Sequence, residues 1–444
     1  MITQSKFIKQ RLDSLAVNEL RSLIARIIKT RGSVLELLLI CIEIINHYRL
    51  NKVLIDFYFV IIKNSNTKTE TIYRFLNLER ATFERPLRMS YLSWVILGRY
   101  ENGRGLKDPQ DTERFLLSVA YSQDDNLIQK ILEMHADLCL RPGLPELLKA
   151  CLEFRRNDPS WVNTMNASKM KVTSLDRKYI RDSEFLKYTK NFHPQDMYLE
   201  LLDQIKLSRV DEKQLTDQTI GLITCDLKYF IIFSEFFCRH FRIKNDLPLI
   251  FTVVLENNPN LLEFNEVCNR LNKYDAIQVR SRRAKLDNLA VEVTNERFIL
   301  APELMIERKS NLVILDIDLK IDFAVTELFV HSENCLSLPI CWSGVPWGRY
   351  AAGLSYFPYS NFSIYFLNLM KEYFSFALKH EPQWTLDQAT FAVVVEYVRS
   401  KQINFQLHDI GIELYLQATR ATPMRLRSAK NRAKGSNLAS LSDS

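Results

Sequence analysis

The sequence predicts an α/β domain with a mainly parallel sheet, preceded by an all-α domain of helical hairpins. At 444 residues the chain is too long for a single hydrophobic core, so we expect two or three domains. Up to about residue 160, apolar residues recur at helical spacing between breaks that contain glycine or short polar residues. From about residue 218, short apolar runs alternate with longer amphipathic stretches, which is typical of a sheet covered by helices on both faces.

The N-terminal part is predicted to be a short, solenoid-like array of hairpins. Leu12, Ala16 and Leu20 begin the first amphipathic stretch, and similar stretches follow as far as residue 154. No fixed period identifies a known repeat, and no cluster of His, Cys and carboxylates predicts chemistry there. We expect a helical-hairpin domain, a helical connector, the α/β domain and a basic disordered tail at residues 1–160, 161–217, 218–418 and 419–444.

The composition is that of a globular protein and excludes several classes of site. Only 11 residues are Gly, which argues against a glycine-rich phosphate loop or a dinucleotide fingerprint. The eight Cys form no CxxC pair, and several lie in apolar runs, so buried free thiols in a reducing compartment are favoured over disulfides or a zinc site. The N-terminus shows no signal pattern, and no early apolar stretch is long enough to cross a membrane. We therefore expect a cytoplasmic protein.

Part of the net charge of +7 is concentrated in the tail, where six basic residues lie between Arg420 and Lys434. The rest of the chain is close to neutral, which predicts no specific nucleic-acid partner. The tail contains no aromatic residue on which a base could stack. We interpret this segment as a solvated tail. The alternative is that it contacts nucleic acid or, peripherally, an anionic membrane surface.

Strands and helices alternate along the C-terminal half. The predicted strands are 219–225, 248–255, 276–279, 311–315, 336–342, 351–357 and 403–407. The predicted helices are 227–241, 295–306 with an interruption at Pro302, 324–330, 362–378 and 386–399.

Two of the predicted strands end in aspartate. Asp226 follows the first strand, and Asp316 and Asp318 follow the strand 311–315. Ligands of open α/β sheets bind beyond the carboxyl ends of the strands. Carboxylates at positions i and i+2 of an extended segment share one side, so Asp316 and Asp318 can hold one hard divalent cation. The alternatives are a chance Asp-x-Asp in a turn, and a haloacid-dehalogenase phosphatase, whose usual continuation is not matched by Leu319 and Lys320.

Five stretches in succession resemble GT-A nucleotide-sugar glycosyltransferases, in particular the glycogenin-like and lipooligosaccharide galactosyltransferase-like group. They are residues 220–229, 295–304, 313–318, 346–357 and 384–389. The resemblance covers roughly residues 218–410 and leaves the N-terminal half untouched. It implies that the α/β domain has the GT-A, Rossmann-like fold.

The resemblance also implies roles for individual residues. The metal ligands would be Asp316 and Asp318, with His408 after the last strand as the third ligand. The donor nucleotide would be contacted by Asp226 and Tyr229, the diphosphate or donor sugar by Arg297, and the sugar side by Ala352 and Gly353. The residues near the anomeric carbon would be Asp387 and Gln388.

Some of these residues also have purely structural interpretations. Asp387 could cap the helix that follows Thr385. His408 could be a hydrogen-bonded residue at the end of a strand. Ala352 stands where many members of the family carry Asn, which removes an amide from the sugar side.

The resemblance implies a glycosyltransferase that moves a sugar from a UDP-sugar to a glycan or protein acceptor. Its cofactor would be Mn²⁺ or Mg²⁺, acting as a Lewis acid on the leaving diphosphate, and the anomeric configuration would be retained. The alternative function is a catalytically degenerate binding or scaffold protein, whose helical domain binds a protein partner.

Overall fold

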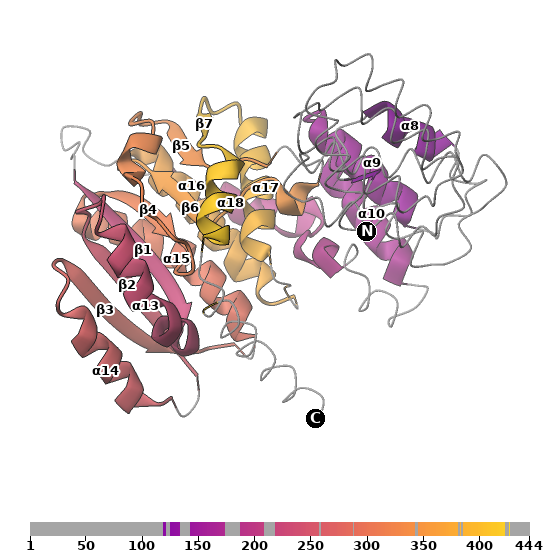
Figure 1. Ribbon diagram of the computed structural model, residues 1–444. Helices are drawn as coiled ribbons and strands as arrows, with labels where there is room; N and C mark the ends of the chain where they lie inside the picture. Colours follow the sequence, from indigo (N-terminus) through magenta and orange to yellow (C-terminus); the bar gives the residue numbers. More distant parts are fainter. Residues whose placement is uncertain are drawn as a thin grey trace, which may run out of the picture. The chain divides into compact units, whose positions relative to one another are not determined.

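The computed structural model describes the greater part of the chain after residue 142 (Figure 1). The described residues are 119–120, 125–133, 143–173, 187–207, 218–256, 259–286, 288–341, 345–380, 382, 385–421 and 426. The chain divides into two units, Met1–Leu152 and Glu153–Ser444. Most of the predicted hairpin domain and of the basic tail lies outside the described residues, so the predicted domain boundaries stay predictions.

The described residues before the sheet are helical. α8 (Asp125–Glu133), α9 (Leu144–Arg155) and α10 (Trp161–Thr173) are α-helices, and α10 was not predicted. Three short turns of helix follow, η1 (Lys187–Asn191), η2 (Gln195–Met197) and α12 (Leu199–Asp203). Phe192 joins this segment to the α/β domain, because its ring lies 5.5 Å from Trp161 and 6.5 Å from Trp347.

The α/β domain is built on one seven-stranded sheet. Its strands are β1 (Thr219–Asp226), β2 (Leu249–Leu255), β3 (Ile277–Arg283), β4 (Asn311–Leu315), β5 (Cys335–Leu338), β6 (Leu354–Phe357) and β7 (Gln406–Asp409). They lie in the order β3-β2-β1-β4-β6-β5-β7. Only β6 runs against both of its neighbours, while the other pairs are parallel. The prediction of a mainly parallel sheet is confirmed.

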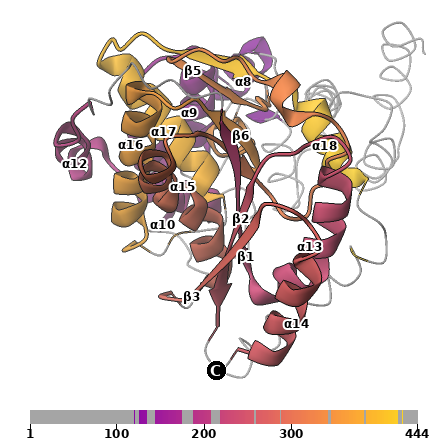
Figure 2. The ribbon, with the colours of Figure 1, turned by 90° about the vertical axis from the view of Figure 1, so that its left-hand side faces the viewer.

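Helices cover both faces of the sheet, as its apolar strands require (Figure 2). α13 (Leu227–Phe241), α14 (Leu261–Leu271) and α18 (Ile412–Arg420) lie on one face. α15 (Leu289–Arg308), α16 (Asn361–Ala377) and α17 (Leu386–Ser400) lie on the other. All residues of β2 and β4 are buried. In β3, exposed residues alternate with half-buried ones, because this strand forms an edge of the sheet. No helix in the described part of the chain is both long and apolar enough to span a membrane.

Some details of this domain differ from the prediction, and the last strand, β7, lies at Gln406–Asp409 and not at 403–407. The expected interruption at Pro302 is wrong, because α15 continues through it to Arg308. A proline removes one helical N–H donor, and here the residues around it, Ala301 and Leu304, are buried and hold the helix in place. The helices α14 and α18 were not predicted. α14 buries only Val267 and Leu271 among its side chains, so its apolar face is narrow.

Candidate functional site

The strand order of the sheet has a topological switch point between β1 and β4. From β1 it adds β2 and β3 on one side and then returns to place β4 on the other. Such a point leaves a crevice beyond the carboxyl ends of the two strands, where open α/β sheets bind ligands. Asp226 is the last residue of β1, and Asp316 directly follows β4. The structure therefore brings together the two strand ends that the sequence singled out.

Asp226 connects β1 to α13. Its Oδ1 accepts a hydrogen bond from the backbone N–H of Tyr229 at 2.7 Å, so it caps the helix. Burial raises the pKa of the Asp226 carboxyl, and this hydrogen bond opposes the shift. The pKa of the Tyr229 hydroxyl is also raised, first by burial and then by the carboxylates of Asp318, Asp226 and Asp316. The charges of all three aspartates at the two strand ends thus act on Tyr229.

Arg297 links two of the predicted site residues through one buried guanidinium. Its side chain is 3% exposed, and its Nη1 donates to Oδ1 of Asp316. Its Nη2 donates to Oδ2 of Asp387 at 3.0 Å. Burial lowers the pKa of Arg297, but the two carboxylates more than compensate and raise it. The guanidinium is charged and fixes both carboxylates.

Asp316 is also held through its other carboxylate oxygen, by Tyr415 of α18. The Tyr415 hydroxyl donates to Oδ2 of Asp316 at 3.0 Å. α18 is positioned by a turn at Gly411, whose φ of 86° favours glycine. It is tied to the loop after β4 by a hydrogen bond from the N–H of Lys320 to the carbonyl of Ala418 at 3.0 Å. Tyr415 was not predicted as a site residue. The sequence indicates it only as an aromatic residue beyond the last strand, in a helix that was not predicted either.

Gly353 makes room for the Asp316 carboxylate. The backbone N–H of Asp316 donates to the carbonyl of Gly353 at 2.8 Å. A Cβ at position 353 would lie 2.5 Å from Cγ of Asp316 and 2.6 Å from the Tyr415 hydroxyl. The close approach of the two segments requires glycine here. The sequence placed Gly353 at the sugar side, and the structure shows it in contact with the predicted metal ligand.

We expect Tyr415→Phe to lower the free energy of unfolding by about 1 kcal/mol. The change removes the hydroxyl that donates to Asp316 and keeps the ring. Urea denaturation measures the effect. The matched control is Tyr274→Phe, because Tyr274 lies at the far edge of the sheet, before β3. An equal loss in both variants would show that the bond to Asp316 contributes nothing specific.

Asp387 lies in the first turn of α17. The N-cap residue is Thr385, so the interpretation of Asp387 as the cap itself is wrong. Its Oδ1 accepts from the N–H of Gln388 at 2.9 Å, and its Oδ2 accepts from Arg297. Burial raises the pKa of Asp387, while the charge of Arg297 lowers it. Gln388 follows and is half-buried.

Two predicted residues are not linked to this network. His408 lies in β7, opposite Ser337, and in the sheet two strands separate β7 from β4. Among the residues that the structure describes, no group of three or more His, Cys, Asp or Glu could hold a metal ion. The ligand role of His408 stays a prediction. Ala352 is buried next to Gly353, and its carbonyl accepts from the Ser355 hydroxyl at 3.5 Å.

Comparisons with known proteins were informative only at the level of structure. No family model matches the sequence, and neither does any curated protein. The bifunctional glycosyltransferase WbbM is similar at 13% identity and a TM-score of 0.31, over 48% of this chain and 52% of its own. Glycosyltransferase GlyE of Streptococcus pneumoniae TIGR4 is similar at 16% identity and a TM-score of 0.31, over 44% of this chain and 45% of its own.

Galactosyltransferase LgtC, solved with donor and acceptor sugar analogs, is similar at 13% identity and a TM-score of 0.27, over 38% of this chain and 69% of its own. This chain thus spans about half the length of the first two structures. All three proteins are glycosyltransferases, the class that the sequence motifs resemble. At these TM-scores the alignments assign no role to any residue, and the roles rest on the geometry described above.

Proposed function

We propose that this protein is a glycosyltransferase of the GT-A type, which moves a sugar from a UDP-sugar to a hydroxyl group of a glycan or protein. One observation carries the proposal. The aspartates at the ends of β1 and β4 all act electrostatically on Tyr229 at the switch point of the sheet, and a buried Arg297 joins Asp316 to Asp387. Such a crevice binds nucleotides in open α/β sheets.

The nucleoside would occupy the side of the crevice formed by the start of α13. Asp226 already accepts the N–H of Tyr229, so one carboxylate oxygen is used by the helix and the other can accept from a base or ribose. The Tyr229 ring packs 5.5 Å from Phe233, which fixes its position. These two residues would select the nucleoside half of the donor.

The residues present fit a divalent cation that is shared with a diphosphate. The Asp316 carboxylate accepts hydrogen bonds from Arg297 through Oδ1 and from Tyr415 through Oδ2, and a carboxylate has about four lone-pair sites in all. Asp318 is half-buried two residues later. Mg²⁺ and similar cations are commonly held by one or two carboxylates together with substrate phosphates and water. When bound, the ion would act as a Lewis acid on the leaving diphosphate.

In the transfer, the acceptor oxygen forms a bond to the anomeric carbon as the bond from that carbon to the diphosphate breaks. The electron pair leaves with the diphosphate, and the hydroxyl proton passes to the leaving group or to water. Arg297 keeps Asp387 and Asp316 in fixed positions and adds positive charge close to where the diphosphate charge develops. Asp387 and Gln388 would face the sugar, with retention of configuration as the expected outcome.

A catalytically degenerate binding protein is the second candidate. One observation favours it: Ala352 is buried and offers no side-chain amide to a sugar hydroxyl. Such a protein would bind the nucleotide without consuming a donor. Hydrolysis or transfer of a UDP-sugar in the presence of Mn²⁺ separates the two candidates.

We expect UDP with Mn²⁺ to raise the melting temperature of the full chain. Saturation at about 100 times the Kd stabilises a protein by about 2.7 kcal/mol, which gives a shift of several degrees. Asp318→Asn should abolish the effect of Mn²⁺, because one of the two carboxylates for the cation is lost. Differential scanning fluorimetry with and without EDTA measures it.

The matched control is Asp322→Asn. Asp322 is an exposed carboxylate close by, paired with Lys320 at 2.8 Å. This variant should keep the full response to UDP and Mn²⁺. If the wild-type chain shows no shift with any nucleoside diphosphate and cation, the proposed function is wrong.

A further inference from the structure

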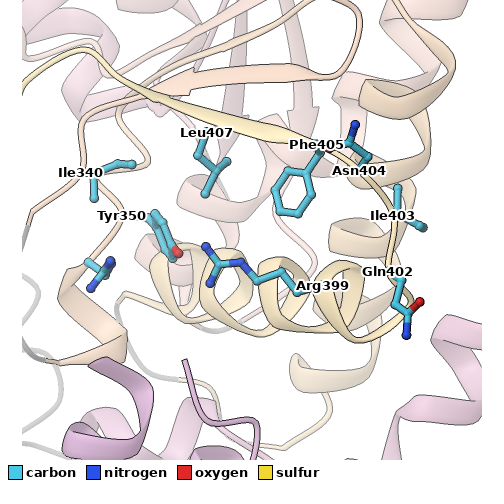
Figure 3. A pocket seen from close by; sticks show the side chains of 9 residues that line it. Ile340, Tyr350, Arg399, Gln402, Ile403, Asn404, Phe405 and Leu407 are labelled. Carbon is cyan, nitrogen blue, oxygen red and sulfur yellow. The ribbon is translucent and has the colours of Figure 1, made fainter. Parts of the chain in front are cut away.

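A cavity of about 500 Å³ opens beside the C-terminal end of α17 (Figure 3). Its apolar walls come from the segment between β5 and β6, with Ile340 and Tyr350, and from the chain around the start of β7, with Phe405 and Leu407. A volume of this size is ordinary for a small-molecule site. No step of the proposed transfer uses this cavity.

The charged side chains that line the cavity already have partners. Arg399 donates to the amide oxygen of Asn157 at 3.1 Å. It also interacts electrostatically with Glu396, which lies one turn earlier on α17. Arg349, the second guanidinium of the lining, interacts with the hydroxyl of Tyr350. Neither guanidinium therefore needs an anionic ligand as its partner.

Carboxylates close to the cavity balance the two guanidinium groups. Glu396 and Asp158 interact electrostatically with each other as well as with their basic neighbours. Oδ1 of Asp409 accepts a hydrogen bond at 2.9 Å from the backbone N–H of Ile340, a residue of the cavity wall. An anionic ligand would meet these carboxylates, whereas a neutral ligand brings no charge that has to be desolvated. The electrostatics of the cavity favour a neutral ligand.

Two side-chain amides supply free polar groups at the cavity. Gln402 and Asn404 line it, and both residues are exposed. Among the residues that the structure describes, neither amide group has a hydrogen-bond partner. An amide both donates and accepts, so it can bind a hydroxyl group in either direction. Figure 3 shows the rings of Tyr350 and Phe405 directed into the same space, where they can contact the C–H groups of a sugar ring.

The backbone at Gln402 indicates that its side chain is used. The end of α17 is a Schellman motif, in which the N–H of Ile403 donates to the carbonyl of Val398 at 3.3 Å. Gln402 precedes Ile403 and has a φ of 55°, in the left-handed region that this motif usually fills with glycine. A glutamine in this conformation costs stability that a glycine would not, which points to a role for its amide.

We propose that this cavity binds a neutral sugar residue, held by the amides of Gln402 and Asn404 and by the apolar walls. The cavity is separate from the site around Asp316. Asp387 lies in the first turn of α17 and Arg399 in its last turn, twelve residues later. At 1.5 Å per residue this places them roughly 18 Å apart along the helix. One sugar residue cannot contact both, so this binding does not depend on the proposed transfer.

Isothermal titration calorimetry on the full chain tests the site with two matched pairs of probes, galactose with galacturonate and glucose with glucuronate. The members of a pair differ only at C6, where the uronate carries a carboxylate. We expect at least one neutral probe to bind, and its uronate to bind more weakly by about tenfold. The proposal is overturned if no neutral probe binds at up to roughly 10 mM, or if the uronates bind as well as the neutral sugars.

Gln402→Gly separates binding from stability. Because glycine is favoured at the left-handed position, this variant should raise the melting temperature by roughly two degrees. It should nevertheless weaken the binding of the neutral probe by about fivefold, since one amide is lost. Asn404→Ala should weaken binding by a similar factor at an unchanged melting temperature.

The matched control is Lys309→Gly. Lys309 follows α15 with a φ of 49°, also in the left-handed region, and does not line the cavity. This variant should gain stability as Gln402→Gly does and bind the sugar as the wild-type chain does. The proposal fails if neither Gln402→Gly nor Asn404→Ala weakens binding, or if Lys309→Gly weakens it as much as they do.

Discussion

Arg297→Met is expected to lower the free energy of unfolding by about 3–5 kcal/mol, because it leaves the carboxylates of Asp316 and Asp387 without the guanidinium that binds both. The guanidinium of Arg297 is 3% exposed, and Asp387 beside it is 7% exposed. Neither group can exchange its partner for bulk water without moving. Asp316 is 27% exposed and would recover part of its hydration. Urea denaturation of the full chain measures the change.

Arg282→Met is the matched control. Arg282 also joins two carboxylates, those of Glu292 and Glu296 on the same helix, but it is 21% exposed. We therefore expect a smaller loss for Arg282→Met than for Arg297→Met. Adding Asp387→Asn to Arg297→Met should restore at least about 1 kcal/mol, since one buried charge is then removed. Equal losses in the two arginine variants, or no recovery in the double variant, would contradict this account.

The strand ends could be predicted because local sequence determines them. A run of apolar residues that stops at a carboxylate marks where a buried strand leaves the core, and this holds for Asp226 after β1 and Asp316 after β4. That the two aspartates lie at the same edge of the sheet then follows, because parallel strands end at the same edge. The helix 227–241 was predicted to the residue, since Asp226 caps it and the break after Phe241 is polar.

The contacts that shape the site could not be predicted in the same way. Tyr415 and Asp316 lie 99 positions apart, and the contact depends on how the chain turns at Gly411 after the last strand. Helical spacing offers Arg297 no partner on its own helix, and the carboxylates that it binds belong to other elements, 19 and 90 positions away. The antiparallel direction of β6 could not be predicted either, because an apolar run of residues has the same pattern whether its strand is parallel or antiparallel to its neighbour.

Because the site depends on contacts between distant segments, a side chain added at Gly353, where two of these segments meet, should disturb it. We expect Gly353→Ala to weaken the binding of UDP with Mn²⁺ at least tenfold and to cost about 1–3 kcal/mol of stability. The added methyl group would lie 2.5 Å from Cγ of Asp316 and 2.6 Å from the Tyr415 hydroxyl. Asp316 has a short side chain, so it can make room only by leaving Arg297, Tyr415 or both. Fluorimetry with UDP and Mn²⁺, together with urea denaturation, measures both effects.

Gly221→Ala distinguishes a specific effect from a general loss of stability. Gly221 lies in β1, and a Cβ there would be 2.6 Å from Cδ2 of Leu249, the end of a flexible apolar side chain. This variant should lose stability through overpacking but keep its response to the nucleotide and the cation. Adding Tyr415→Phe to Gly353→Ala relieves only the contact with the hydroxyl, so binding should stay weak. If the double variant regains full binding, the obstruction is at Tyr415, and Asp316 is not the group that Gly353 protects.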